Sequence, residues 1–175
     1  MKRTFIIGDL HFGHENVIKY ENRPFDDVNQ MDSTLINNWN KEVASKDKVI
    51  VVGDFGFYNK EKTKELLSRL KGYKVLIMGN HDRRRGNRKW WLDAGFDEVM
   101  EFPIILEKCY ILSHKPISMS DDMPYFNIHG HVHSNSLESD KYINVSVEVT
   151  GYKPVDFESL RTLRQYSNIN VMTEC

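Results

Sequence analysis

Three short apolar segments of this sequence are each followed by residues that can ligate a metal ion or move a proton. The segments cover residues 4–8, 48–53 and 73–79, and their composition predicts buried parallel strands. The residues that follow them are Asp9 and His11, then Asp54, then the run Asn80-His81-Asp82. Because ligands bind outside the carboxyl ends of strands in open α/β sheets, we expect these side chains to form one site.

Histidines strengthen the prediction of a metal site. The sequence contains seven, and four of them fall in roughly the last third of the chain: His114, His129, His131 and His133. His131 and His133 repeat the two-residue spacing of Asp9 and His11, which places both side chains on one side of an extended chain. Carboxylate, amide and imidazole donors together suit Mn, Fe, Zn, Co or Ni better than Ca or Mg. The alternative explanation is a set of turn caps and core histidines.

In chain order, these residues resemble the five sequence motifs of the calcineurin-like metallophosphoesterases. The matching stretches lie within residues 8–133, and they are Asp9-x-His11, Gly53-Asp54, Gly79-Asn80-His81-Asp82, His114 and Gly130-His131-x-His133. One motif alone would be a weak signal, whereas all five in order form a specific pattern. Residues 8–14 and 22–25 also look like the small bacterial and phage members of that family.

The resemblance implies two divalent metal ions, with manganese as the first choice and iron, zinc, cobalt or nickel as alternatives. One ion would be held by Asp9, His11, Asp54 and His133. The other would be held by Asp54, Asn80, His114 and His131, so that Asp54 bridges the two. It also implies in-line attack by a hydroxide bridging the ions, because a metal can lower the pKa of bound water to about 7.

The same resemblance gives two residues of the third loop a catalytic role. His81 would donate a hydrogen bond to the phosphate or protonate the leaving alkoxide. Asp82 would orient the His81 ring and fix its tautomer. Acid–base help of this kind typically accelerates a reaction by about 10²–10⁴-fold.

The sequence departs from the family pattern at the residues that hold phosphate. Phosphoprotein phosphatases of the family carry Asp-Arg-Gly after their Gly-Asp, whereas Gly53-Asp54 continues here as Phe55-Gly56-Phe57. The missing arginine favours a diester or a nucleotide over a phosphoprotein. The side chains for which we predict substrate contacts instead are His14, Arg23, Arg83 and Arg84. In the alternative interpretation, His14 caps a helix and the arginines after Asp82 form a solvated basic surface.

Two functions of different classes agree with these motifs. The first is an enzyme that hydrolyses a small or nucleotide-like phosphomonoester or phosphodiester. The second is a non-catalytic scaffold that retains the fold and binds a partner. Scaffold relatives usually lose metal ligands and the catalytic histidine, and none of the matched positions is lost here. Metal analysis separates the two, because the enzyme requires two bound ions and the scaffold requires none.

The expected helices place the polar loops at strand ends. Apolar residues at helical spacing predict a helix through residues 31–39, with Asn29 or Asp32 as its cap. A second helix is predicted over residues 61–70. Strands that alternate with helices favour right-handed βαβ units.

The second half of the chain reads as short strands separated by turns. These predicted strands cover residues 98–102, 104–106, 109–113, 126–129 and 142–147. One clear helix follows, with Asp156 as its cap. We therefore predict an α/β (α+β) fold, a layered α-β-β-α sandwich with mixed central sheets flanked by helices. A single domain would cover residues 1–175, with a frayed tail at about 168–175.

The composition is that of an ordinary globular protein. The 175 residues are 40% hydrophobic and carry a net charge of −1. Such a neutral balance gives no indication of nucleic-acid binding, and it argues against a polybasic membrane surface. No apolar run approaches the about 20 residues of a bilayer span, and no signal peptide pattern is present. Two cysteines are too few for a disulfide framework, so we expect a cytoplasmic protein with Cys109 buried and Cys175 on the tail. The oligomeric state stays open.

Overall fold

The computed structural model describes residues 2–120 and 122–167. Its strands are β1 (Thr4–Ile7), β2 (Lys48–Val51), β3 (Tyr73–Ile77), β4 (Glu98–Met100), β5 (Ile104–Leu106), β6 (Tyr110–Ser113), β7 (Phe126–His129), β8 (Tyr142–Asn144) and β9 (Val155–Asp156). Its helices are α1 (Glu15–Tyr20), α2 (Val28–Glu42), α3 (Lys60–Arg69), α4 (Asn80–Arg85), α5 (Arg88–Ala94), α6 (Val147–Thr150) and α7 (Phe157–Ser167). The predicted tail at 168–175, with Cys175, lies outside the described residues.

The first sheet brings the three predicted loops to one edge. Its strand order is β4-β3-β2-β1-β9, with β1 to β4 parallel and β9 antiparallel to β1. In the register of this sheet, Ile7 lies opposite Val51, and Val51 lies opposite Leu76. The chain therefore leaves β1, β2 and β3 at nearly the same level, as the sequence predicts.

The second sheet supplies the remaining strand ends. Its order is β5-β6-β7-β8, in which β5 is antiparallel to β6 and the other pairs are parallel. The chain beyond β8 crosses to the first sheet, where the Gly8 N–H donates to the Val145 carbonyl at 2.8 Å. Val145 in turn donates to the His129 carbonyl at the end of β7, also at 2.8 Å. These bonds join the carboxyl ends of the two sheets.

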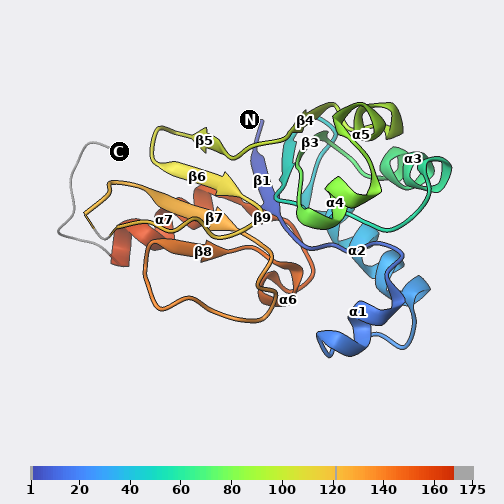
Figure 1. Ribbon diagram of the computed structural model, residues 1–175, viewed down its shortest axis with the longest axis horizontal. Coiled ribbons are helices and arrows are strands. Elements are labelled where there is room, and N and C mark those ends of the chain that lie inside the picture. Colours follow the sequence, from blue (N-terminus) through green and yellow to red (C-terminus); the bar gives the residue numbers. More distant parts are fainter. Residues whose placement is uncertain (1, 121, 168–175) are drawn as a thin grey trace.

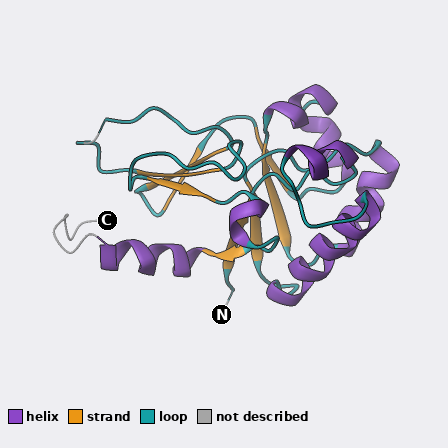
Figure 2. Ribbon diagram, turned by 90° about the horizontal axis from the view of Figure 1, so that it is seen from below, coloured by secondary structure: helices purple, strands orange, loops and turns teal. Residues whose placement is uncertain are grey.

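Two layers of helices and two sheets make up the molecule, which confirms the predicted fold class. Helices α2 to α5 gather beyond the first sheet, on the side away from β6 to β8 (Figure 1). Figure 2 shows this helical layer on one side of the strands and the second sheet on the other. Helix α7 lies beside β1 and β9 of the first sheet and contacts the second sheet at its first turn, where the rings of Tyr110 and Phe157 lie 5.1 Å apart.

Alternate side chains of each strand point to opposite faces of the first sheet, and this divides the hydrophobic core into two clusters. In β2 and its continuation, Ile50 and Val52 face the second sheet and pack with Leu112. Their neighbours Val49 and Val51 face the helices. Both faces of the first sheet are therefore buried, which explains why its strands are apolar throughout.

Several local predictions need correction. Helix α2 is capped by neither Asn29 nor Asp32, because the carboxylate of Asp27 accepts the Gln30 N–H at 2.8 Å. The strand predicted over 142–147 ends at Asn144, and the chain then turns into α6. The Asp156 carboxylate accepts the Glu158 N–H at 3.1 Å and caps α7 as expected. Cys109 is buried as predicted.

Candidate metal centre

Glycines allow the strand ends to approach one another. Gly53 has a φ of +91°, and a Cβ at this position would collide with the His114 ring. Gly79 adopts an ordinary φ, but a Cβ there would collide with the Asp54 carboxylate. These two loops can thus pack directly against the candidate ligands only because no side chain intervenes.

Five of the candidate ligands have an unusual backbone conformation. Their φ angles are positive: Asp9 55°, His11 52°, Asp54 53°, His131 71° and His133 53°. The two-residue spacings predict convergence from an extended chain, and this reason is wrong, because the chain turns at each position. Non-glycine residues in the left-handed region cost about 1–3 kcal/mol each and cluster at functional sites.

Asp9, His11 and His133 form the first donor group. One ligand atom from each lies within 4.8 Å of the other two. Oδ2 of Asp9 accepts hydrogen bonds from the His131 N–H and from the Ser146 hydroxyl, both at 2.8 Å. These bonds fix the Asp9 carboxylate and leave its second oxygen facing the group.

Asp54, His114 and His131 form the second donor group, again with ligand atoms within 4.8 Å of one another. The amide oxygen of Asn80 lies 2.9 Å from His114 Nε2 and joins them. Asp54 also reaches the first group, because its Oδ2 lies 3.4 Å from His114 Nε2 and 3.6 Å from His11 Nε2. All seven predicted ligands therefore converge, with the Asp54 carboxylate between the two donor groups.

The donor atoms of the first group fit a cation. Among the described residues, Asp9 Oδ1 and His11 Nε2 are buried side-chain atoms without a hydrogen-bond partner. Buried polar groups are almost always paired, so two unpaired atoms with lone pairs in one donor group require an explanation. A divalent ion between them would satisfy both, and the mixed oxygen and nitrogen donors match Mn, Fe or Zn.

The pKa shifts divide the candidate ligands into two sets. Burial lowers the pKa of His11 well below its ordinary value, and burial together with the His114 charge lowers that of His131 to about 4. Burial opposes ionisation of Asp54, but the hydrogen bond and charge of His114 outweigh it and hold the Asp54 pKa at about 2. Burial lowers the pKa values of His114 and His133, but hydrogen bonds and charges of nearby carboxylates outweigh it and raise both, while burial raises the pKa of Asp9 to about 6. Metals bind neutral imidazoles and ionised carboxylates, so a bound cation would oppose these three shifts.

Comparison with known proteins identifies the family. Residues 2–169 match the family described as calcineurin-like phosphoesterase. The chain belongs to the calcineurin-like phosphoesterase family. This confirms the resemblance seen in the sequence motifs.

Two relatives of this calcineurin-like phosphoesterase share most of its length. It is 41% identical over 171 residues to the uncharacterized protein MJ1445 of Methanocaldococcus jannaschii, covering 90% of this chain and 89% of that protein. The crystal structure of AQ665 from Aquifex aeolicus, titled a protein of unknown function, superposes with a TM-score of 0.73. That similarity covers 93% of this chain and all 100% of the other, at 26% identity.

In this member of the family, His81 lies at the rim of the donor groups. Its side chain is 33% exposed, and its Nε2 lies 3.9 Å from Asp54 Oδ2. Its backbone N–H donates to the other oxygen of Asp54 at 3.0 Å. The ring is thus open to solvent on one side and faces the donor groups on the other.

The role predicted for Asp82 is wrong. Its carboxylate does not orient the His81 ring, because it accepts the backbone N–H groups of Gly79, Asp54 and Phe55 at 2.8, 2.8 and 3.0 Å. Burial and the nearby Asp54 charge raise the pKa of Asp82 to about 7. Asp82 instead ties the loop after β3 to the loop after β2.

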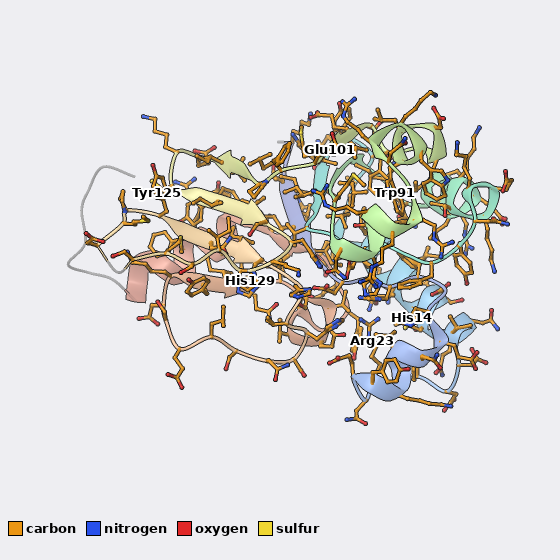
Figure 3. All side chains as sticks on the ribbon, viewed as in Figure 1. His14, Arg23, Trp91, Glu101, Tyr125 and His129 are labelled. Atoms are coloured by element: carbon orange, nitrogen blue, oxygen red, sulfur yellow. The ribbon has the colours of Figure 1, made fainter. Side chains whose placement is uncertain are left out.

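Arg23 also differs from its prediction. Its side chain is 0% exposed, and the guanidinium donates to Glu148 and to the Asp9 and Leu10 carbonyls. A substrate cannot reach it, so Arg23 braces the loop after β1. In Figure 3, Arg23 and His14 are labelled on the α1 side of the molecule.

Of the other predicted substrate contacts, His14 and Arg83 lie beside candidate ligands, whereas Arg84 is exposed on α4 and does not line the cleft next to them. His14 occupies the cap position of α1 without a capping hydrogen bond from its side chain, and its Nδ1 lies 3.2 Å from His11 Nδ1. Its ring stacks on Phe57 at 4.1 Å. Arg83 and Arg84 are exposed on α4, and the Arg83 guanidinium donates to the Glu101 carbonyl.

Sequence reasoning misses two residues that support the ligands. Oε1 of Glu148 lies 2.9 Å from His133 Nδ1, and the Ser146 hydroxyl holds Asp9. Ser146 lies inside the strand predicted over 142–147 and Glu148 directly follows it. Neither belongs to a sequence motif that indicates a role in metal binding. His129, by contrast, is buried in β7 with its Nδ1 2.9 Å from the Gly130 carbonyl, so it is a core histidine outside the donor groups.

None of the helices in the described ranges combines the length and the apolar character that a membrane crossing demands.

Proposed function

We propose that this calcineurin-like phosphoesterase is a two-metal enzyme that hydrolyses a small phosphomonoester or phosphodiester. The observation that most supports this proposal is the position of Asp54. Its Oδ2 lies 3.4 Å from Nε2 of His114 in the second donor group and 3.6 Å from Nε2 of His11 in the first. Asp9, His11, Asp54 and His133 would hold one ion, and Asp54, Asn80, His114 and His131 the other. Manganese is the first choice.

Bound divalent ions would supply positive charge for the phosphate oxygens and lower the pKa of coordinated water. The protein's own contribution is to fix the donors before substrate arrives. Ser146 and the His131 N–H fix one oxygen of Asp9, the His81 N–H fixes one oxygen of Asp54, and the Val52 carbonyl lies 3.0 Å from His114 Nδ1. Each of these contacts occupies one polar atom of a candidate ligand and leaves its other atom free for a metal ion: Oδ1 of Asp9, Oδ2 of Asp54 and Nε2 of His114.

His81 is the residue we assign to proton transfer. Hydrolysis forms a bond between phosphorus and the oxygen of water and breaks the bond to the ester oxygen, which must gain a proton. His81 Nε2 faces the Asp54 carboxylate from a half-exposed position, where a bound phosphoester would lie. It can therefore hold the phosphate by a hydrogen bond or protonate the leaving alkoxide.

The test uses purified protein stripped with a chelator and reloaded with Mn²⁺. We expect close to two metal equivalents and turnover of p-nitrophenyl phosphate or its bis ester that disappears on stripping. Metal binding without turnover of any phosphoester would contradict the enzyme. A protein that binds no metal would instead support the scaffold function.

A further inference from the structure

A cleft extends from the second donor group to the molecular surface. Its volume is about 410 Å³, within the range of small-molecule sites. Asn80 and His114, two candidate ligands, line its inner end. The floor is the end of β3, and the walls come from α4, from the connection between β4 and β5, and from the segment after β6. A molecule in this cleft would therefore touch the metal centre at one end.

The outer wall of the cleft is apolar and open to solvent. Phe102 is 77% exposed, more than any other large apolar side chain of the described residues. It lines the cleft together with Pro103, Pro116 and Ile117. A flat aromatic group laid on the Phe102 ring would bury this surface, since base–aromatic stacking needs only an exposed π-face.

Two cations line the cleft: Lys115 beside His114, and Arg83, whose guanidinium reaches the backbone next to Phe102. Arg83 lies three residues after Asn80 in α4, so both side chains share a face of that helix. Lys115 directly follows His114 and is exposed. The opposing charge is Glu101, which also lines the cleft and is exposed, and whose carbonyl accepts from Arg83. The balance next to the donor groups is positive, which favours a ligand with phosphate beyond the one at the metal centre.

We infer that this cleft is a nucleotide subsite. It takes a small nucleotide with two phosphate groups, such as a nucleoside diphosphate. One phosphate lies at Asn80 and His114, the other meets Lys115 and Arg83, and the base stacks on Phe102. The inference rests on the proposed function and names the substrate class for the same site, extending it from an ester to a phosphoanhydride. Attack of water on the phosphate at Asn80 and His114 would break its bond to the bridging oxygen, and the nucleoside monophosphate would leave with that oxygen, which gains a proton.

Binding of a non-hydrolysable analogue, α,β-methylene-ADP, to the manganese-loaded protein tests the subsite by calorimetry without turnover. Phe102→Ala should raise its Kd about tenfold, because one stacking contact is lost. The matched control is Ile105→Ala, which removes a 60% exposed side chain that does not line the cleft. Its Kd should equal that of the wild type. No binding to wild type, or equal Kd values for both variants, would overturn the subsite.

A second pair of variants tests the cations. Lys115→Met should weaken binding of the diphosphate analogue about fivefold more than binding of AMP. Only the diphosphate has a second phosphate that contacts Lys115, so only its binding loses that charged hydrogen bond. Lys64→Met, an exposed lysine on α3, serves as the control. Equal weakening of both nucleotides would contradict the placement of the second phosphate.

Kinetics separates failure of the subsite from failure of the function. With ADP and glycerol 2-phosphate as substrates, Phe102→Ala should raise the KM for ADP about tenfold and leave that for glycerol 2-phosphate within about twofold. Wild-type protein that binds the analogue but cleaves neither ADP nor glycerol 2-phosphate would refute the enzyme and keep the subsite. Turnover of both substrates with unchanged KM values in Phe102→Ala would refute the subsite alone.

Discussion

Nη2 of Arg23 lies 2.6 Å from Oε1 of Glu148, although 125 residues separate them in the sequence. Their side chains are 0% and 5% exposed. The same guanidinium donates to the carbonyls of Asp9 and Leu10 at 2.7 and 3.0 Å, and the same glutamate oxygen lies 2.9 Å from His133 Nδ1. One buried ion pair thus connects the backbone at Asp9 with the ring of His133, and both belong to the first donor group.

Glu148→Gln should weaken metal binding by the first donor group. The variant keeps the size of the side chain but removes the charge that orients the His133 ring, and loss of such a partner typically costs about 10–100-fold in metal affinity. Calorimetric titration with Mn²⁺ should show one tight and one weak ion. Glu158→Gln, at a side chain that is 70% exposed on α7, should bind both ions as the wild type does. Two equally tight ions in Glu148→Gln would contradict the prediction.

Arg23→Met should destabilise the fold. Removing the guanidinium leaves the Glu148 carboxylate buried with its charge opposed only by His133, and breaking a buried pair from one side costs about 3–5 kcal/mol. Urea unfolding measures the loss in the free energy of unfolding. Arg84→Met on the exposed face of α4 should stay within about 0.5 kcal/mol of the wild type. A substrate-binding arginine would show the reverse pattern, with an increased KM and unchanged stability.

His81→Ala should lower kcat by about 10²–10⁴-fold, because the proton donor is lost. Its side chain is 33% exposed and lies no closer than 3.9 Å to Asp54 Oδ2, and the backbone N–H that holds Asp54 remains in the variant, so both metal ions should remain bound. The measurement pairs steady-state kinetics with metal analysis of the same sample. Loss of a metal ion in this variant would mean that His81 is a ligand instead.

The pH dependence of stability can be predicted at Asp47, far from the donor groups. Its carboxylate accepts the N–H groups of Arg3 and Ala44 at 3.0 and 2.9 Å, and these bonds hold the pKa of Asp47 below its ordinary value of 3.8. A lowered pKa stabilises the fold above the ordinary value, and the effect is lost as the pH falls through the folded-state pKa.

Asp47→Asn should therefore cost about 1.5 kcal/mol of unfolding free energy at pH 7. The difference from the wild type should shrink as the pH drops below about 4, where the carboxylate of the unfolded chain is already protonated. Urea unfolding at several pH values checks this. If the difference in unfolding free energy between Asp47→Asn and the wild type stayed constant down to the lowest pH measured, the shape of the Asp47 side chain and not its charge would be stabilising.

The sequence patterns predicted the convergence of the seven candidate ligands better than the contacts that support them. Asp54 and Asn80 follow strands whose apolar character is local, so their meeting at one sheet edge follows from parallel pairing. The φ angles of 55° at Asp9 and 71° at His131 have no such local signal. The tertiary structure imposes them, and an extended strand end was therefore the wrong geometry.

Long-range partners were beyond the reach of sequence reasoning. Arg23 and Glu148 meet only because the chain after β8 crosses to Gly8, and nothing near either residue marks the pair. Asp82 illustrates the same problem at short range. Its position next to His81 suggests a contact with that ring. The carboxylate instead accepts hydrogen bonds from backbone N–H groups of the loops after β2 and β3.

The left-handed backbone at Asp9, His11, Asp54, His131 and His133 has a bearing on how this chain would evolve. A descendant that abandoned metal chemistry would no longer benefit from side chains held in that conformation. Glycine or asparagine adopts it at less cost, so those residues would relieve the strain without altering the sheets. Divergent copies should accumulate them at these five sites first, and such a substitution pattern would mark a lineage that keeps the architecture without the proposed metal chemistry.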